Sequence, residues 1–206
     1  MRGRRTGFPV MAHGLVGLVG GVAGAAGGLL WLMMRGKLTL DLGWGRSFHT
    51  VGPLTARIEA PRPLVFQQIA GPYLGRTPKE ARQHLEVWER SSDMVLARHF
   101  SKVGFYTAET VETVRFEEPE RVLFRHVRGP VPYVTEEFVL REDGDATLFS
   151  YTGELGIDFW FLGRIAGQRW VVPEWERQVR PHIDQLKERA EARAGARRRR
   201  SGHTDT

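Results

Sequence analysis

Three polar side chains stand in apolar surroundings where they could support chemistry, namely His126, Tyr151 and Arg164. Inside an apolar pocket, convergent groups of these types can hold an enolate and move protons. Alternate residues of a strand share a face, so His126 lies with Phe124 and Tyr151 lies with Phe149. The other face of the strand that carries His126 is nearly as apolar, and polar residues of a sheet commonly face solvent or stabilise the fold. Catalysis is therefore one alternative, and a structural role for these residues is the other.

The histidines form no metal-binding pattern in the sequence. His84, His99 and His126 fall in separate strand-like runs without a paired carboxylate beside them, and the chain has no cysteine. We interpret them as structural or surface residues, and we expect no metal and no cofactor. Glycine-rich phosphate loops and the H-E-x-x-H and G-x-S-x-G motifs are also absent, which disfavours the common cofactor enzymes.

The elements that would position these residues are mostly strands. Runs rich in Val, Phe, Thr and Tyr alternate with turn signals such as Glu142-Asp143-Gly144-Asp145. The predicted strands are 54–59, 84–90, 94–102, 105–117, 121–128, 133–141 and 146–155. Two short helices should follow the first strand, one after Pro63 and one over 78–83, where Thr77 opens a capping box.

A long helix is predicted to end the domain, because apolar residues recur at intervals of three, four or seven. The predicted apolar stripe consists of Ile165, Val172, Trp175, Val179, Ile183, Leu186 and Ala190. This stripe should lie on the sheet. Pro173 and Pro181 interrupt the hydrogen-bond ladder, so we expect a bend or a break near one or both.

The order of elements and several local motifs resemble the SRPBCC superfamily of START domains, Bet v 1 allergens and polyketide cyclases, over residues 52–190. The motifs are Ile58-Glu59-Ala60-Pro61 followed by Val65-Phe66-x-x-Ile69, then Glu109-Thr110-Val111, Leu123-Phe124-Arg125-His126 and Tyr133-Val134-Thr135-Glu136-Glu137-Phe138. The resemblance implies an α+β helix-grip (Bet v 1-like) fold, in which a seven-stranded antiparallel sheet wraps around a long C-terminal helix. It also implies a cavity between them for lipids, sterols, polyketides or other apolar molecules.

In this superfamily the pocket opens near the start of the long helix, where the sequence has a run of aromatic residues. Each of these could instead fill the core. The predicted ligand-binding residues are Phe124, His126, Tyr151, Trp160, Arg164 and Trp170. No catalytic residue is assigned.

The N-terminal segment predicts a membrane anchor. Residues 7–34 contain no Lys, Arg, Asp or Glu, and about 20 apolar residues span a bilayer. A cleaved signal peptide is the alternative, but its apolar region is usually shorter, about 7 to 15 residues. The predicted organisation is a basic tail (1–9), a transmembrane helix (10–34), a juxtamembrane linker (35–51), the globular domain (52–193) and a basic disordered tail (194–206).

The glycines of this segment and its flanking charges raise two further expectations. Gly20, Gly24 and Gly28 recur every four residues, which permits a homodimer through close helix contact or reflects the frequency of glycine in membrane helices. Basic residues flank both ends, so the positive-inside rule gives a near tie, which translation from Met11 would break in favour of a cytoplasmic domain. We therefore expect a single-pass protein of the cell membrane.

The positive charge of the chain lies largely in its two tails. The formal net charge is +6, and Arg2, Arg4, Arg5 and the four residues 197–200 supply seven positive charges. The domain itself is close to neutral, so we expect no nucleic-acid partner. The C-terminal tail could bind anionic membrane lipids.

Together these patterns predict a membrane-anchored module that binds or transports a hydrophobic ligand, such as a lipid or a polyketide-like molecule. A polyketide cyclase or aromatase acting in the same cavity is the alternative. A third possibility is a structural or regulatory protein that uses the fold only as a docking surface.

Overall fold

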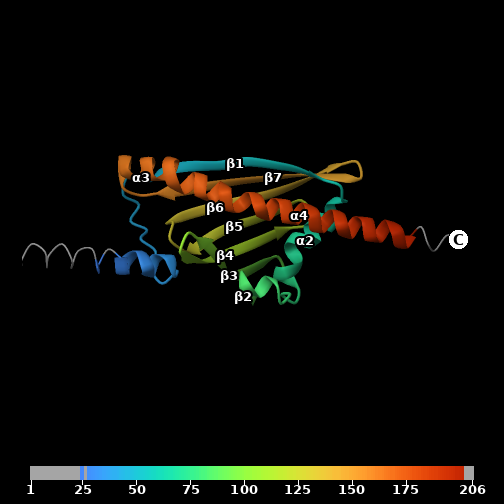
Figure 1. Cartoon of the computed structure of the whole chain (residues 1–206), viewed down its shortest axis with the longest axis horizontal. Coiled ribbons are helices and arrows are strands. Elements are labelled where there is room, and N and C mark those ends of the chain that lie inside the picture. The colour runs from blue at the N-terminus through green and yellow to red at the C-terminus, as the bar shows by residue number, and fades with distance from the viewer. Residues whose placement is uncertain (1–23, 26, 202–206) are drawn as a thin grey trace, which may run out of the picture.

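The computed structural model describes residues 24, 25 and 27–201 (Figure 1). Its strands are β1 (Ser47–Ile58), β2 (Leu85–Arg90), β3 (Met94–Val103), β4 (Tyr106–Glu117), β5 (Arg121–Arg128), β6 (Tyr133–Asp143) and β7 (Ala146–Ile157). Residues 27–34 are helical, and the further helices are α2 (Arg62–Leu74), the 3-10 turn η1 (Ala81–Gln83), α3 (Trp160–Ala166), the π-helical segment η2 (Gly167–Val171) and α4 (Val172–Ser201).

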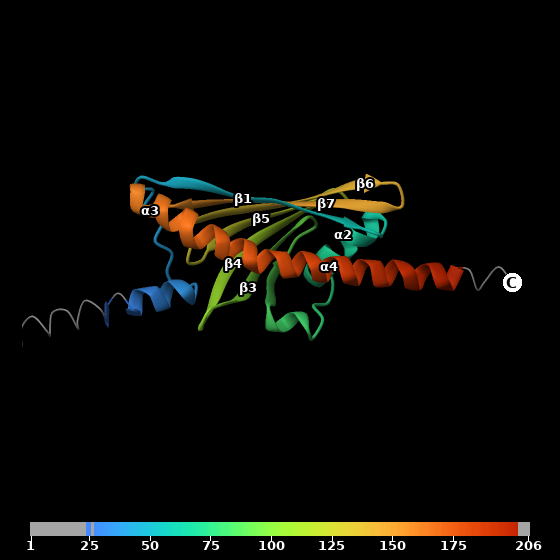
Figure 2. The ribbon, with the colours of Figure 1, turned by 45° about the horizontal axis from the view of Figure 1, so that its top comes forward.

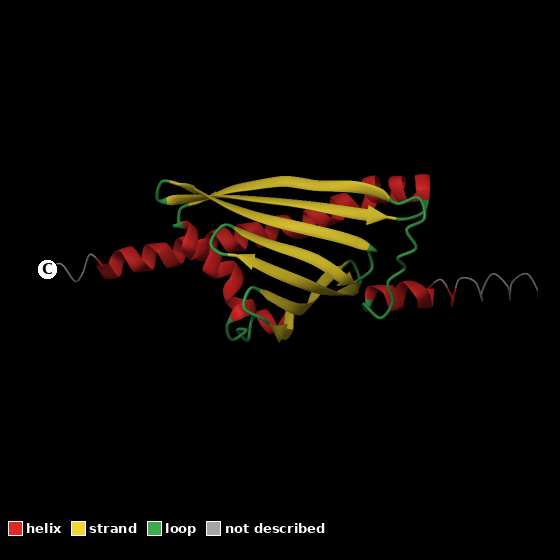
Figure 3. Cartoon of the chain, turned by 180° about the vertical axis from the view of Figure 1, so that it is seen from behind, coloured by secondary structure: helices red, strands yellow, loops and turns green. Residues whose placement is uncertain are grey.

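The strands form one seven-stranded antiparallel sheet in the order β1-β7-β6-β5-β4-β3-β2. The six strands after α2 form a meander, and β1 pairs with the last of them, β7. Figure 3 shows the back of the sheet, which no helix of the described residues covers. The predicted antiparallel sheet is confirmed, because short turns between consecutive strands permit only antiparallel neighbours.

The helices α3, η2 and α4 run in sequence diagonally across the front of the sheet, as Figure 2 shows. Ile183, Leu186 and Ala190 of α4 are buried in the core. The helix packs mainly against β1 and α2. It therefore covers the inner face of the central strands only in part. The predicted helix-grip arrangement of sheet and long C-terminal helix is confirmed.

The long helix is segmented where proline predicts it. The π-helical turn η2 ends directly before Val172 and Pro173, because proline has no N–H to continue the regular ladder. Pro181 lies inside α4 without a break in the helix. The predicted apolar stripe is too long, however, because Ile165 precedes the π turn and is 47% exposed.

The first strand begins seven residues earlier than predicted, at Ser47 instead of Leu54. Gly52 and Pro53 look like a strand end, but they occupy a bulge, where the register with β7 shifts between Val51 and Leu54. A bulge tolerates both residue types within a strand. The domain therefore includes residues that the sequence assigns to a linker.

Residues 35–46, which belong to the predicted juxtamembrane linker (35–51), are bound to the domain. Arg35 pairs with buried Glu109 at 2.9 Å, and the hydroxyl of Thr39 donates to the Gly129 carbonyl at 3.0 Å. The backbone N–H groups of Leu42 and Gly43 both donate to the Asp158 carboxylate at 2.9 Å. We name residues 35–46 the docking segment.

Two further expectations need correction. Residues 81–83 form only a 3-10 turn instead of a helix over 78–83, because the Thr77 hydroxyl donates to the Pro72 carbonyl and caps no helix. The tail predicted to be disordered from residue 194 continues α4 to Ser201, since Ala194 is buried against the core and alanine favours helix.

The predicted membrane-spanning helix lies largely outside the described residues, which leave out 1–23 and 26. Gly20 lies outside them, whereas Gly24 and Gly28 are exposed, with open space beside their Cα atoms. Within the described part of the chain, no helix has the length and apolar character needed to cross a membrane.

Asp158→Asn should release the docking segment and destabilise the domain. The Asp158 carboxylate is almost fully buried and accepts from Arg46 Nε at 2.7 Å. Removing one partner of a buried ion pair costs about 3 kcal/mol of unfolding free energy. The Arg46 guanidinium, against the opposing effect of burial, holds the pKa of Asp158 below its ordinary value. The stabilisation is therefore complete above that ordinary value and is lost as pH falls through the lowered pKa.

Thermal denaturation as a function of pH tests this prediction. The melting temperatures of the parent and variant should differ at neutral pH and converge in acid. Asp143→Asn is the matched control, because Asp143 pairs with Arg57 in an exposed ion pair. A parent-to-variant difference no larger than in this control would contradict the role of Asp158.

Candidate functional site: a Glu–His–Glu cluster on the inner face

Four strands of the sheet bring ionisable side chains together on its inner face. Glu112 of β4 lies directly opposite His126 of β5. Glu136 of β6 lies opposite Phe124, two residues before His126, and Tyr151 of β7 lies opposite Phe138. Alternation along each strand places these residues on the same face as the buried core. The side chains of Glu112, His126 and Glu136 are 8%, 3% and 13% exposed.

Glu112 is surrounded by two imidazoles. Its Oε1 lies 3.0 Å from His126 Nε2 and accepts from the Thr110 hydroxyl, while its Oε2 lies 3.2 Å from His99 Nδ1. The His126 N–H direction misses the carboxylate, so neither ring nitrogen of His126 forms an aligned hydrogen bond with the described residues. Glu112 and His126 therefore form a close ion pair without an aligned hydrogen bond.

Glu136 is held by two donors on one oxygen. Its Oε1 accepts from the Tyr151 hydroxyl at 2.6 Å and from Trp175 Nε1 at 3.0 Å. The other oxygen, Oε2, faces His126 Nε2 at 4.0 Å. Gly153 makes room for this arrangement, because a Cβ atom there would lie 2.8 Å from the Tyr151 hydroxyl. Trp175 comes from α4, so the helix and the sheet meet at Glu136.

Burial and neighbouring charges have opposite effects on the ionisation of Glu112 and His126. Burial disfavours the ionised form of Glu112, but the charges of His99 and His126 outweigh it and hold the pKa of Glu112 well below its ordinary value. Burial likewise disfavours protonated His126, but the adjacent Glu112 and Glu136 raise the pKa of His126 above its usual value. The cluster therefore favours carboxylate and imidazolium over the neutral pair.

Two buried phenols border the cluster. The Tyr73 hydroxyl lies 2.9 Å from His99 Nε2, and the Tyr151 hydroxyl donates to Glu136. Burial first, and then the nearby carboxylates, raise the pKa of both tyrosines well above the usual phenol range. Both phenols therefore remain protonated donors at neutral pH.

A cation could bind at the centre of the cluster. Glu112, His126 and Glu136 each offer one ligand atom, and these three atoms lie within 4.8 Å of one another. This group is assembled from three neighbouring strands, so it cannot be read as a short sequence motif.

Solvent reaches part of the interior around the cluster. Phe138 lies on the inner face of a central strand and contacts the rings of Phe124, Phe149 and Tyr151, yet it is only partly buried. Trp175, above Glu136, is also partly buried. This partial exposure follows from the path of α4 along β1 and α2, which leaves the middle of the sheet incompletely covered.

Two surface pockets lie away from the cluster's interior. One, of about 630 Å³, is lined mainly by outward-facing residues of the sheet such as Thr113, Arg125 and Glu137, and Phe124 and Glu136 also contribute to its lining. The other, of about 520 Å³, lies between η1 and β2 and is lined by Arg76, Arg82 and other residues. Neither pocket contains His126 or Tyr151.

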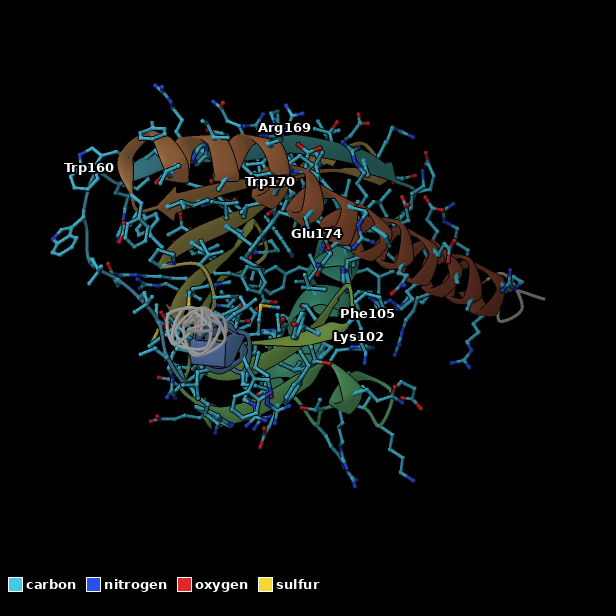
Figure 4. All side chains as sticks on the ribbon, turned by 60° about the vertical axis from the view of Figure 1, so that its left-hand side comes forward. Lys102, Phe105, Trp160, Arg169, Trp170 and Glu174 are labelled. Atoms are coloured by element: carbon cyan, nitrogen blue, oxygen red, sulfur yellow. The ribbon has the colours of Figure 1, made fainter. Side chains whose placement is uncertain are left out.

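The structure divides the predicted ligand-binding residues into two groups. Phe124, His126 and Tyr151 are buried on the inner face, at the cluster. Trp160, Arg164 and Trp170 are exposed on α3 and η2, and Figure 4 shows Trp160 and Trp170 at the surface. The second group does not join the cluster, because α3 and η2 lie before the part of α4 that is buried against the core.

Sequence reasoning missed Glu112, Glu136 and the pairing of His99 with Glu112. The signal was present in the alternation of the strands. Glu112 shares a face with Val114 and Phe116, and Glu136 shares one with Val134 and Leu140. A carboxylate in such a series of apolar residues is a candidate for burial, and buried carboxylates require partners.

Comparisons with known structures agree with this fold. The chain is similar to protein TTHA0849 from Thermus thermophilus, with 18% identity and a TM-score of 0.57 over 71% of this chain and 99% of the other. It is similar to norcoclaurine synthase from Thalictrum flavum, with 11% identity and a TM-score of 0.52 over 70% of this chain and 87% of the other.

The di-domain aromatase/cyclase StfQ from the steffimycin biosynthetic pathway is also similar, with 10% identity and a TM-score of 0.54. The matched region covers 73% of this chain and 52% of StfQ, about half the length of that protein. At these identities the likeness establishes a shared Bet v 1-like fold and nothing finer. Comparison with protein-family models and with curated proteins gives no match.

Proposed function

We propose that the protein binds a small apolar molecule that carries a hydroxyl or carbonyl group, with this polar group at Glu136 and His126. The supporting observation is the convergence of two carboxylates, two imidazoles and a phenol inside a partly open apolar interior. An apolar cavity with a few fixed polar groups is typical of small-molecule sites. The aromatic side chains of Phe124 and Phe138 would contact the apolar body of the ligand.

Binding of 2-naphthol, compared with 2-methylnaphthalene, tests this proposal. The hydroxyl can donate to Glu136, and a hydrogen bond to a charged group contributes about 1.5 to 3 kcal/mol. The full chain in detergent should therefore bind 2-naphthol at least about tenfold more tightly. Glu136→Gln should remove most of this preference, measured by isothermal titration calorimetry.

The neighbouring residue supplies the control. Glu137 points to the opposite face of β6, where it pairs with Arg121 at 3.1 Å. Glu137→Gln should keep the preference for 2-naphthol over 2-methylnaphthalene. The same variant also corrects for partition of the two probes into detergent micelles. Equal affinity of the parent chain for the two probes would refute the proposal. An equal loss of the preference for 2-naphthol in Glu136→Gln and Glu137→Gln would also refute it.

Proton-transfer catalysis of the cyclase or aromatase type is the second candidate function, and the same convergence favours it. The Glu136 carboxylate would take a proton from the carbon beside a carbonyl, and the enolate oxygen that forms would accept hydrogen bonds from His126 or Tyr151. The cycle is complete when a solvent proton adds to the carbon and the proton on Glu136 is released to solvent. General acid–base groups of this kind accelerate proton transfer by about 10² to 10⁴-fold.

Deuterium exchange into an apolar ketone, 1-(2-naphthyl)propan-2-one, measures this activity by NMR in D2O. The parent chain should exceed the buffer rate by at least about 100-fold. Glu136→Gln should reduce exchange to the buffer rate, whereas Glu137→Gln should not. Exchange at the buffer rate in the parent chain would leave ligand binding as the function.

We further propose that residues 10–34 anchor the chain in a membrane and that one end of the domain rests on the bilayer. The ends of β3, β5 and β7 and the starts of β1, β4 and β6 meet at this end, because the sheet is antiparallel. Exposed large apolar side chains gather there, on the docking segment, the start of β1, the β3–β4 turn, the end of β5 and the start of α3. They include Leu42, Trp44, Phe48, Phe105, Tyr106, Val127, Phe159, Trp160, Phe161 and Leu162.

Two features of this surface suit a lipid interface. Exposed basic residues, among them Lys37, Lys102 and Arg128, accompany the apolar ones, and anionic headgroups attract such charges. Phe159 and Trp160 both adopt a left-handed backbone, with φ of 79° and 48°, which is unfavourable for large residues and persists where surrounding structure enforces it. Their backbone N–H groups donate to Trp44 and Gly45 of the docking segment.

The chain has no cysteine, so single cysteines can report on this surface. Phe105→Cys and Phe161→Cys, each labelled with an NBD fluorophore in full chain reconstituted into liposomes, should emit at shorter wavelength and be quenched by doxyl-labelled lipids. Leu148→Cys is the control, because Leu148 is exposed near the start of β7, at the opposite end. Equal quenching at all three positions would contradict the proposed orientation.

A further inference from the structure

We infer that Glu112, His126 and Glu136 form a binding site for one divalent first-row transition metal ion. The three ligand atoms come from adjacent strands β4, β5 and β6 and lie within 4.8 Å of one another. This site goes beyond the proposed binding of an apolar molecule and does not depend on it.

The spacing of the ligand atoms suits a small cation. Two ligands at about 2.1 Å from a tetrahedral ion are roughly 3.4 Å apart. His126 Nε2 lies 3.0 Å from Glu112 Oε1 and 4.0 Å from Glu136 Oε2. These two separations bracket the value for a tetrahedral ion. The widest separation in the group is as much as 4.8 Å, so the two carboxylates would shift inward to hold one ion.

His126 provides an independent indication. Its side chain is only 3% exposed, yet Nε2 forms no aligned hydrogen bond with the described residues, although it faces two carboxylates. A buried polar atom without a partner is unusual and calls for a bound water, an ion or a catalytic role. An ion between Nε2 and the carboxylates would occupy the direction in which no hydrogen bond is made.

The groups behind the three ligands would fix their orientation. The Thr110 hydroxyl donates to Glu112, and Tyr151 and Trp175 donate to Oε1 of Glu136, which leaves Oε2 directed at His126. Metal-binding carboxylates are commonly held by such outer hydrogen bonds. His126 lacks one on Nδ1 and is instead in contact with the Trp175 ring, with ring centres 5.6 Å apart.

The donor set selects the class of metal. One imidazole nitrogen with two carboxylates and no thiolate suits Zn²⁺, Mn²⁺ or Fe²⁺, whereas Ca²⁺ and Mg²⁺ prefer oxygen ligands alone. Three protein ligands leave a position for water or for an oxygen of a bound molecule, as in catalytic zinc sites. Such an ion would also neutralise the two buried carboxylates.

Zinc binding by the full chain, purified in detergent without a polyhistidine tag and stripped with EDTA, tests this inference. Titration against a chromophoric chelator should show one Zn²⁺ per chain. His126→Ala and Glu136→Gln should each weaken binding by at least about 100-fold, since loss of outer partners alone costs about 10 to 100-fold. Tyr151→Phe, which removes only an outer partner, should weaken binding by about tenfold.

Matched controls separate this site from surface binding. His84 is exposed and outside the cluster, so His84→Ala should leave zinc affinity unchanged, as should Glu137→Gln. Co²⁺ in place of zinc should give visible absorption bands that His126→Ala abolishes. Circular dichroism establishes that each variant is folded, and Glu136→Gln carries the test if His126→Ala does not fold.

Two results would overturn the inference. One is a parent chain that retains no stoichiometric Zn²⁺, Mn²⁺ or Fe²⁺, and the other is a folded Glu136→Gln variant with the affinity of the parent. Either result would mean that His126 serves only as the charge partner of the two carboxylates. Because no organic ligand is present in these titrations, their failure would not affect the test with 2-naphthol.

Discussion

The buried carboxylate of Glu112 is the constraint on which the inner face of this domain depends. An ionised carboxylate inside a sheet is unfavourable by several kcal/mol unless nearby charges compensate for the lost water. His126 and His99 supply that compensation from the strands on either side of β4. His126 in turn faces Glu136, and His99 contacts the Tyr73 hydroxyl. One buried charge thus brings side chains from several elements into a single network.

This network also explains how the long helix is joined to the sheet. Most contacts of α4 are apolar and run along β1 and α2. Trp175 is different, because its indole N–H donates to both Glu136 and the Tyr151 hydroxyl. A second polar contact of α4 lies farther along the helix, where the Glu59 N–H donates to Glu191 at 2.9 Å. The contact of Trp175 is the one directly above the cluster, so a change in the cluster would alter how the helix packs on the sheet.

Much of the fold follows from local sequence patterns, whereas the site depends on register. Turn residues such as Gly144 and alternating apolar residues predict the meander, because both act over a few positions. The start of β1 was missed, since Gly52 and Pro53 are strand breakers except at a bulge. Glu112 and Glu136 were missed because their partners are close only after the strands pair. Among the proposed ligand residues, alternation predicted the inward position of His126 and Tyr151, but helical periodicity could not place Trp160 or Trp170.

The docking segment has a mechanical consequence. Arg35 binds Glu109 of β4, Thr39 binds the turn after β5 at Gly129, and Asp158 holds the segment next to α3. A force that pulls on the residues before Arg35 therefore acts on the same end of β4 and β5, close to Glu112 and His126, before it reaches the rest of the core. Tension along the chain would therefore strain this end of the two strands, and the ion pair between Glu112 and His126, before it strained the outer strands.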